Sequence, residues 1–325
     1  MDLRTVLIAL TVIASAMTVL FIIHAETDNS SAETVYSGQC GPSVYYTFST
    51  DGTLEISGTG AMYDYSGFTG HSPWYADINE IKKIVIGDDI SYLGQWAFVK
   101  CRHATELTIP ITLNSVSSDV SCAFAGCINL EKVNFTCGKD GNGYGYAAYK
   151  GFDSWYQNTP WYQSKDTLKE ISFADGIRHI GSDAFRELNI SSVVIPDTVG
   201  SLGCHCFFNC TKLTDLTIPV SLNSYGDAKY PAFHDCKVLE NITITRGSEV
   251  PYDYCTFTSS LSDLAAWNIN KDVAKKVTIS EDVRKLGSCM FYGTTLKELT
   301  IPSDLVTQGI TTILDLKHLM NPLRK

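Results

Sequence analysis

The chain has 325 residues, of which 44% are hydrophobic and 18% charged, and its formal net charge is −10. This apolar content is enough to build a folded core and excludes global disorder. The excess of acidic residues argues against nucleic acid or an anionic membrane surface as the main partner, because both repel negative charge.

The N-terminus predicts export from the cytoplasm. An apolar run of 18 residues extends from Val6 to Ile23. It is longer than the usual core of a signal peptide and close to the shortest membrane span. Residues 1–25 therefore have two open interpretations, a signal peptide cleaved after Ala25 or an N-terminal membrane anchor. Both place the chain from Glu26 onward outside the cytoplasm, in the extracellular space or at the cell surface.

The next segments predict a linker and a cap. Residues 26–39 are polar and rich in Ser and Thr, which is typical of a linker. Two alternating segments, 45–48 and 53–56, flank Asp51-Gly52 and predict a β-hairpin. Residues 40–75, which contain this hairpin and a loop rich in Gly and aromatic residues, are expected to cover the first coil of the repeats that follow.

A repeat organises the rest of the chain. Residues 72–98 return at 159–185, shifted by 87 residues without a gap, and a weaker third copy ends at Phe291. Inside this long repeat, a shorter unit recurs mostly every 22–26 residues. Such periodicity indicates a solenoid of the leucine-rich-repeat type. We therefore expect an α/β repeat solenoid over residues 76–302, with inserts at about 137–165 and 246–272 where the spacing is longer.

Each short unit contains a three-residue strand with the pattern apolar–polar–apolar. In an extended strand the flanking side chains point inward and the middle side chain points outward. The outward column consists of Val85, Thr108, Asn134, Ser172, Val194, Thr217, Thr243, Thr278 and Thr300. The column one residue before each strand has mixed charge and consists of Lys83, Glu106, Lys132, Glu170, Ser192, Asp215, Asn241, Lys276 and Glu298.

The segments after the strands carry a family resemblance. A turn with Leu-Gly, as at Leu93-Gly94, is followed by Ala-Phe-x-x-Cys-x-x-Leu, as at Ala232–Leu239. Over roughly residues 40–302 this pattern resembles the BspA-type leucine-rich repeat of microbial surface proteins. The resemblance implies a right-handed solenoid of short parallel strands and short helices, exported to the cell surface and used in binding or adhesion without catalysis. Residues 303–325 lack the signature and predict a C-terminal cap.

The chain contains 11 cysteines. Four of them, Cys101, Cys127, Cys210 and Cys236, lie three residues after a repeat Phe and predict a ladder of buried small side chains. An exported protein could instead bridge neighbouring coils by disulfides, and that alternative stays open. The Cys204-His205-Cys206 segment lacks a second Cys/His pair. The segment from Asp140 resembles the start of a calcium loop, but Tyr144 replaces the third ligand and Gly151 stands in place of the closing Glu. We expect no metal and no cofactor.

No catalytic motif stands out in the sequence. The carboxylates at Asp88, Asp175 and Glu281 occupy the equivalent turn of three repeat copies. A shared structural role in the turn explains them better than acid–base chemistry, so the sequence does not predict an enzyme.

Two groups of residues are candidates for ligand binding. Aromatic clusters precede Trp74, Trp161 and Trp267, which are themselves expected to pack where the inserts leave the coil. The side chains of the outward strand column are short and mostly polar, which is typical of the docking face of a solenoid. The predicted partner is a protein or carbohydrate on another cell or surface, and the alternative is an envelope component that associates with itself. The ligand-binding candidates are Tyr63, Tyr65, Tyr252, Tyr254, Thr108, Asn134, Thr217, Thr243 and Thr278.

Overall fold

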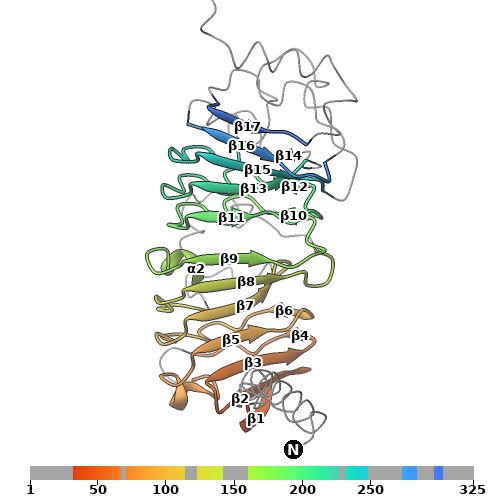
Figure 1. Ribbon diagram of the computed structural model, residues 1–325. Helices are drawn as coiled ribbons and strands as arrows, with labels where there is room; N and C mark the ends of the chain where they lie inside the picture. Colours follow the sequence, from red (N-terminus) through yellow and green to blue (C-terminus); the bar gives the residue numbers. More distant parts are fainter. Residues whose placement is uncertain are drawn as a thin grey trace, which may run out of the picture.

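The computed structural model describes residues 32–66, 71–113, 123–141, 160–220, 222, 224–225, 231–247, 273–283 and 296–302. Short strands stack one above another along an elongated molecule, from β1 at one end to β17 at the other (Figure 1). The predicted leader at 1–25, most of both inserts, Trp267, Phe291, Tyr252, Tyr254 and residues 303–325 lie outside the described residues.

Two hydrogen-bonded sheets form the long face of this β-solenoid. The first contains β1 (Thr34–Gly41), β2 (Val44–Ser49), β3 (Thr53–Gly58), β5 (Lys83–Ile86), β7 (Glu106–Pro110), β8 (Lys132–Thr136) and β9 (Glu170–Phe173). The second contains β11 (Ser192–Val194), β13 (Asp215–Pro219), β15 (Asn241–Thr245), β16 (Lys276–Ile279) and β17 (Glu298–Thr300). From β3 onward, neighbouring strands within each sheet are parallel, and each belongs to a successive coil.

Two smaller sheets line the turn that follows the long face. One contains β10 (His179–Ile180), β12 (Ser201–Leu202) and β14 (Ser224–Tyr225), and the other pairs β4 (Gly60–Ala61) with β6 (Ile90–Tyr92). Helical structure in the described residues is limited to η1 (Tyr75–Asp77) and α2 (Pro160–Gln163). The expected short helix in every repeat is therefore replaced in most described coils by turns.

The N-terminal region differs from the prediction in one respect. The expected hairpin is present, with β2 and β3 antiparallel around the Asp51-Gly52 turn. However, β1 starts at Thr34, inside the segment 26–39 that was interpreted as a linker, and pairs antiparallel with β2. Its polar side chains were misleading because much of the strand is exposed while its backbone is bonded to β2. The linker interpretation is wrong for residues 34–39.

Apolar alternation in the strands supplies one side of the core, and a stack of aromatic rings fills its centre. The described residues of the predicted Phe column are at most 1% exposed: Phe98, Phe124, Phe185, Phe207 and Phe233. Their rings stack from coil to coil, with centroids 4.7 Å apart for Phe98 and Phe124 and 5.2 Å apart for Phe207 and Phe233. The register inferred from the sequence is confirmed at these positions.

Trp74 and Trp161 are buried packing residues, as expected. Their exposed fractions are 0% and 1%. Each indole nitrogen donates a hydrogen bond to the carbonyl of the Ala before the repeat Phe, Trp74 to Ala97 at 2.9 Å and Trp161 to Ala184 at 2.7 Å. The same bond in two copies of the long repeat explains why the Trp–Ala spacing is kept in both.

The predicted cysteine ladder is also present. Cys101, Cys127, Cys210 and Cys236 are 0% exposed and are free thiols in the structure. Three of the four donate to a Phe carbonyl of the preceding coil: Cys127 Sγ to Phe98 O at 3.1 Å, Cys210 Sγ to Phe185 O at 3.2 Å, and Cys236 Sγ to Phe207 O at 3.1 Å. Burial raises the pKa of Cys210 well above its usual value, which keeps the thiol protonated.

Candidate binding surface and family

The outward column forms a continuous row within each of the two sheets. The strand pairings place Val85 beside Thr108, Thr108 beside Asn134, and Asn134 beside Ser172. In the second sheet, Val194 pairs with Thr217, and the row continues through Thr243, Thr278 and Thr300. We call these residues the outward row. The structure therefore brings together the candidates Thr108 and Asn134, and separately Thr217, Thr243 and Thr278.

Six of the seven charged side chains in the column beside the outward row form ion pairs between coils, and the seventh, Asp215, accepts a hydrogen bond from Asn241. Lys83 lies 3.2 Å from Glu106, Lys132 lies 3.0 Å from Glu170, and Lys276 lies 3.3 Å from Glu298. These pairs are exposed, so each contributes little to stability. Their main consequence is that the face carries little local charge although the chain is acidic. The sequence already contained the signal, since the sign alternates along Lys83, Glu106, Lys132 and Glu170.

Asn134 is held by its neighbours on the outward row. Its Nδ2 donates to Glu106 Oε1 at 2.9 Å, and its Oδ1 accepts from Ser172 Oγ at 2.6 Å. Asn241 makes a similar bond from Nδ2 to Asp215 Oδ1 at 2.9 Å. Side chains fixed in this way present a preformed polar surface, which lowers the entropy lost when a partner binds.

Val194 departs from the polar character of the row. Its side chain is 61% exposed, the highest value among the exposed large hydrophobic residues of the described chain. It belongs to β11, the first strand of the second sheet, and therefore stands where the two sheets meet.

The two described aromatic candidates have different environments. Tyr63 is 47% exposed and available to a ligand. Tyr65 packs edge-on against Trp74, with ring centroids 6.0 Å apart, and burial is the main cause that raises the pKa of its hydroxyl far above its usual value. Tyr65 is therefore largely committed to packing. The ligand roles assigned to Tyr63 and Tyr65 stay predictions.

The turn carboxylate Asp88 has the structural environment expected of it. Its Oδ1 accepts a short hydrogen bond from Thr136 Oγ1 and a bond from Gly138 N at 3.3 Å. Asp197 accepts the same bond from Thr245 Oγ1, and in both cases donor and acceptor are 48 residues apart. Each bond ties a coil to the second coil after it. These hydrogen bonds were not predicted from the sequence, because no local pattern marks a contact over two coils.

Among the described residues, no group of three or more His, Cys, Asp or Glu side chains is placed to hold a metal ion. In the same part of the chain, the search for a helix long and apolar enough to cross a membrane found none.

Comparison with known protein families agrees with this geometry. The model of the BspA type leucine rich repeat region matches residues 72–146, 158–275 and 250–312, in six copies. The chain belongs to this family. The match covers the stacked coils and their Phe and Cys columns, so the BspA type repeat accounts for more than half of the molecule. None of the curated proteins compared with the chain shows significant similarity to it.

Several solved structures resemble the chain at low identity. A leucine-rich repeat protein from T. pallidum is 13% identical, with a TM-score of 0.30 and coverage of 85% of this chain and 93% of that one. A leucine rich cell surface protein from Faecalibacterium prausnitzii is 14% identical, with a TM-score of 0.27 and coverage of 84% and 78%. A leucine-rich repeat protein from Eubacterium ventriosum is 17% identical, with a TM-score of 0.24 and coverage of 82% and 85%. Identities and TM-scores this low support no inference about the function of this chain.

Proposed function

We propose that the protein is an exported surface protein that binds a protein or glycan partner on the outward row, without catalysis. The observation that carries the proposal is the row itself: small polar side chains in register, with the neighbouring charges paired between coils. Such a face offers many hydrogen-bonding groups and little charge repulsion to a large partner. Membership of the BspA type family supports protein binding or adhesion as the general role.

The proposal also includes the leader, the handedness, the cap and the aromatic candidates that were expected from the sequence. Residues 1–25 act as a signal peptide or membrane anchor, and the solenoid is right-handed. The β1–β3 unit covers the N-terminal end of the stack, where the first coil would otherwise expose apolar side chains. Tyr63 and the other aromatic candidates extend the binding surface beyond the strands.

Charge substitutions on the outward row test the proposal. Thr108→Arg and Thr243→Arg place long charged side chains on the row without touching the core. Purified protein is first screened against glycan arrays and surface proteins, and the variants are then compared with Lys237→Glu, a substitution at an exposed turn away from the strands. We expect the row variants to weaken binding about tenfold or more while the control leaves it unchanged. Equal binding by all variants would contradict the assignment.

The alternative role is a structural envelope component that associates with itself. Sedimentation velocity over a range of protein concentrations separates the two roles. A monomer at all concentrations favours the binding role, whereas assemblies that grow with concentration favour the envelope role.

A further inference from the structure

The long face is interrupted between β9 and β11. All other successive strands of the face that the structure describes belong to one hydrogen-bonded ladder or the other, whereas β9 ends the first sheet and β11 begins the second. Figure 1 shows the break as a wider interval between these two arrows. We call the facing edges of Glu170–Phe173 and Ser192–Val194 the open seam.

Backbone bonds that recur at the other junctions are missing at the seam. Glu170 N donates to Glu131 O at 3.1 Å, and Asp215 N donates to Ser191 O at 3.2 Å. The corresponding bond, from Ser192 N to Lys169 O, is absent from the described structure. Because backbone groups alternate between the two sides of a parallel strand, those of Ile171, Phe173, Ser192 and Val194 face the opening. These are the groups that lack a strand partner.

Phe173 packs in the core beside the break. At the last inward position of the strand, β9 carries Phe173 and β8 carries Phe135, whereas β11, β13 and β15 contain or are followed by Ile. Because β8 is bonded to strands on both sides, a Phe at this position does not by itself open the sheet. The Phe173 ring packs 5.5 Å from the ring of Phe135 and 5.4 Å from that of Phe185.

The two coils stay attached elsewhere. β10 and β12 pair in parallel, and Gly200 N donates to Arg178 O at 3.0 Å. Further along, Phe185 N donates to Cys206 O at 2.8 Å. The opening is therefore local to the strand face, and the bonded side can act as a hinge.

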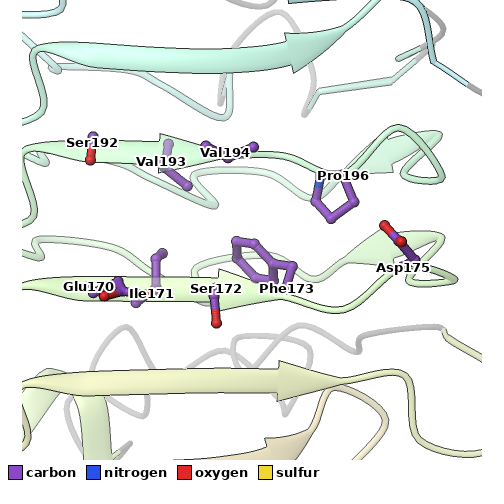
Figure 2. Close-up of a pocket in the computed structure, with 9 residues that line it drawn as sticks. All are labelled: Glu170, Ile171, Ser172, Phe173, Asp175, Ser192, Val193, Val194 and Pro196. Atoms are coloured by element: carbon purple, nitrogen blue, oxygen red, sulfur yellow. The ribbon is translucent and has the colours of Figure 1, made fainter. Parts of the chain in front are cut away.

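A cavity of about 340 Å³ occupies the seam. Figure 2 shows the strands that border it, with Asp175 and Pro196 at its far end. The charged residues of its lining are both acidic, Glu170 and Asp175. Glu170 is paired with Lys132, whereas Asp175 is exposed and has no ion pair in the described structure. Val194 adds an exposed apolar side chain at the rim.

We propose that the open seam accepts an extended, basic peptide segment of a partner protein as an added strand. A peptide backbone supplies donors and acceptors at the spacing of the unpaired groups on both edges, and a Lys or Arg side chain matches Asp175, whose charge is not compensated by an ion pair within the described residues. The inference rests on the proposed binding function and specifies a class of partner for it.

Insertion requires the seam to widen. An added strand needs two interstrand spacings, about 9.6 Å, between β9 and β11. Cα atoms of the two strands now approach within 8 Å, so the gap must open by a few ångströms. At any other junction this motion would break a ladder of hydrogen bonds, and at the seam there is none to break. The seam is therefore the least costly point of entry on the described face.

A synthetic peptide provides the test. The probe is acetyl-Lys-Val-Thr-Val-Thr-Lys-amide with a fluorescent label, titrated with the full chain and followed by anisotropy. The control peptide has the same sequence with alternate amides N-methylated, which removes backbone donors on one edge. We expect the control to bind about tenfold or more weakly. Val194→Lys, at the rim, is expected to weaken binding by a similar factor, whereas the matched Val35→Lys, at an exposed Val of β1 outside the outward row, does not.

Hydrogen exchange gives a second readout. In the free protein the amides of Ile171, Phe173, Ser192 and Val194 should exchange faster than those of Val193 and Thr217, and the peptide should slow them. Lack of peptide binding, equal binding of the methylated peptide, or equal exchange rates would each overturn the seam proposal. If the peptide fails while Thr108→Arg still weakens partner binding, the seam proposal fails alone. If Thr108→Arg and Thr243→Arg also leave partner binding unchanged, the proposed function fails as well.

Discussion

At the scale of single residues, the coils depend on backbone conformations that most residues avoid. Seven residues other than glycine have positive φ in the described chain: Trp96, Lys100, Asp183, Glu187, His205, Asn209 and Asp235. They recur at two fixed positions, two residues before and two residues after the repeat Phe. At the second position, two residues after the Phe, the amide donates to the next coil, as Lys100 N does to Ala125 O at 2.7 Å and Glu187 N to Phe208 O at 2.7 Å. The strained conformation thus aims a backbone donor along the stack.

Lys100→Gly should therefore stabilise the protein. Gly126 already occupies the equivalent position, with φ of 82°, and Lys100 is exposed with φ of 63°. Relief of the left-handed strain is expected to raise the free energy of unfolding by about 1 kcal/mol. Urea unfolding measures the change. The control Arg102→Gly, at a neighbouring exposed position without positive φ, should destabilise, and a Lys100→Gly protein no more stable than the parent would contradict the argument.

His179 should make stability depend on pH. Its Nδ1 lies 2.7 Å from Ser201 Oγ, and burial lowers the pKa of the imidazole below its usual 6.5. Between the two values the unfolded chain binds the proton more readily than the folded chain, so the free energy of unfolding falls as the pH drops below about 6.5. Thermal unfolding at a series of pH values should show a smaller acid loss for His179→Gln than for the exposed control His103→Gln. The same acid loss in both variants would exclude His179 as its source.

At the scale of elements, each coil contributes one strand and one Phe, and it is stable only against its neighbours. The stack of Phe185, Phe207 and Phe233 joins three successive coils, with centroids 5.2 Å apart at both steps. Removal of the middle ring therefore affects the contacts on both sides.

Phe207→Ala should cost about 3–5 kcal/mol of unfolding free energy, because it empties a fully buried site. The neighbouring Phe208 lies partly exposed against Arg186, whose guanidinium is 4.6 Å from the ring centroid. Phe208→Ala is the matched control and should cost much less. Denaturant unfolding of both variants measures the difference, and an unchanged transition for Phe207→Ala would refute the coil register.

The thiol ladder predicts a pattern of chemical labelling. Cys101, Cys127, Cys210 and Cys236 should resist iodoacetamide in the folded protein and react after denaturation, because they are buried. Cys137 and Cys204 are partly exposed and should be labelled earlier. Mass spectrometry of digested protein identifies each site. Rapid labelling of all four buried thiols under native conditions would rule out the ladder.

At the scale of the whole molecule, the question is which surface is open to partners. Two sequons, at Asn134 and Asn241, lie on or beside the outward row, and both amides are bonded to neighbouring side chains. A glycan at either position would cover the proposed binding face.

We expect Asn134 and Asn241 to be unmodified in the mature protein. Mass spectrometry of native material checks the prediction, with Asn29, Asn189 and Asn209 as the comparison sequons. An occupied Asn134 would move the proposed site to the aromatic candidates Tyr63, Tyr65, Tyr252 and Tyr254.

The sequence by itself determined the stacking of this protein. In a solenoid, residues one repeat apart lie in neighbouring coils, so sequence spacing translates directly into the Phe column, the Cys ladder and the outward row. Only the tertiary structure decided the features that depend on contacts between coils outside the repeat pattern. The break between β9 and β11 has no counterpart in the repeat pattern, and the Asp88–Thr136 hydrogen bond joins coils that are two repeats apart. The strand β1 consists of residues whose polarity suggested a linker, because its structure is specified by backbone pairing with β2 and not by its own pattern.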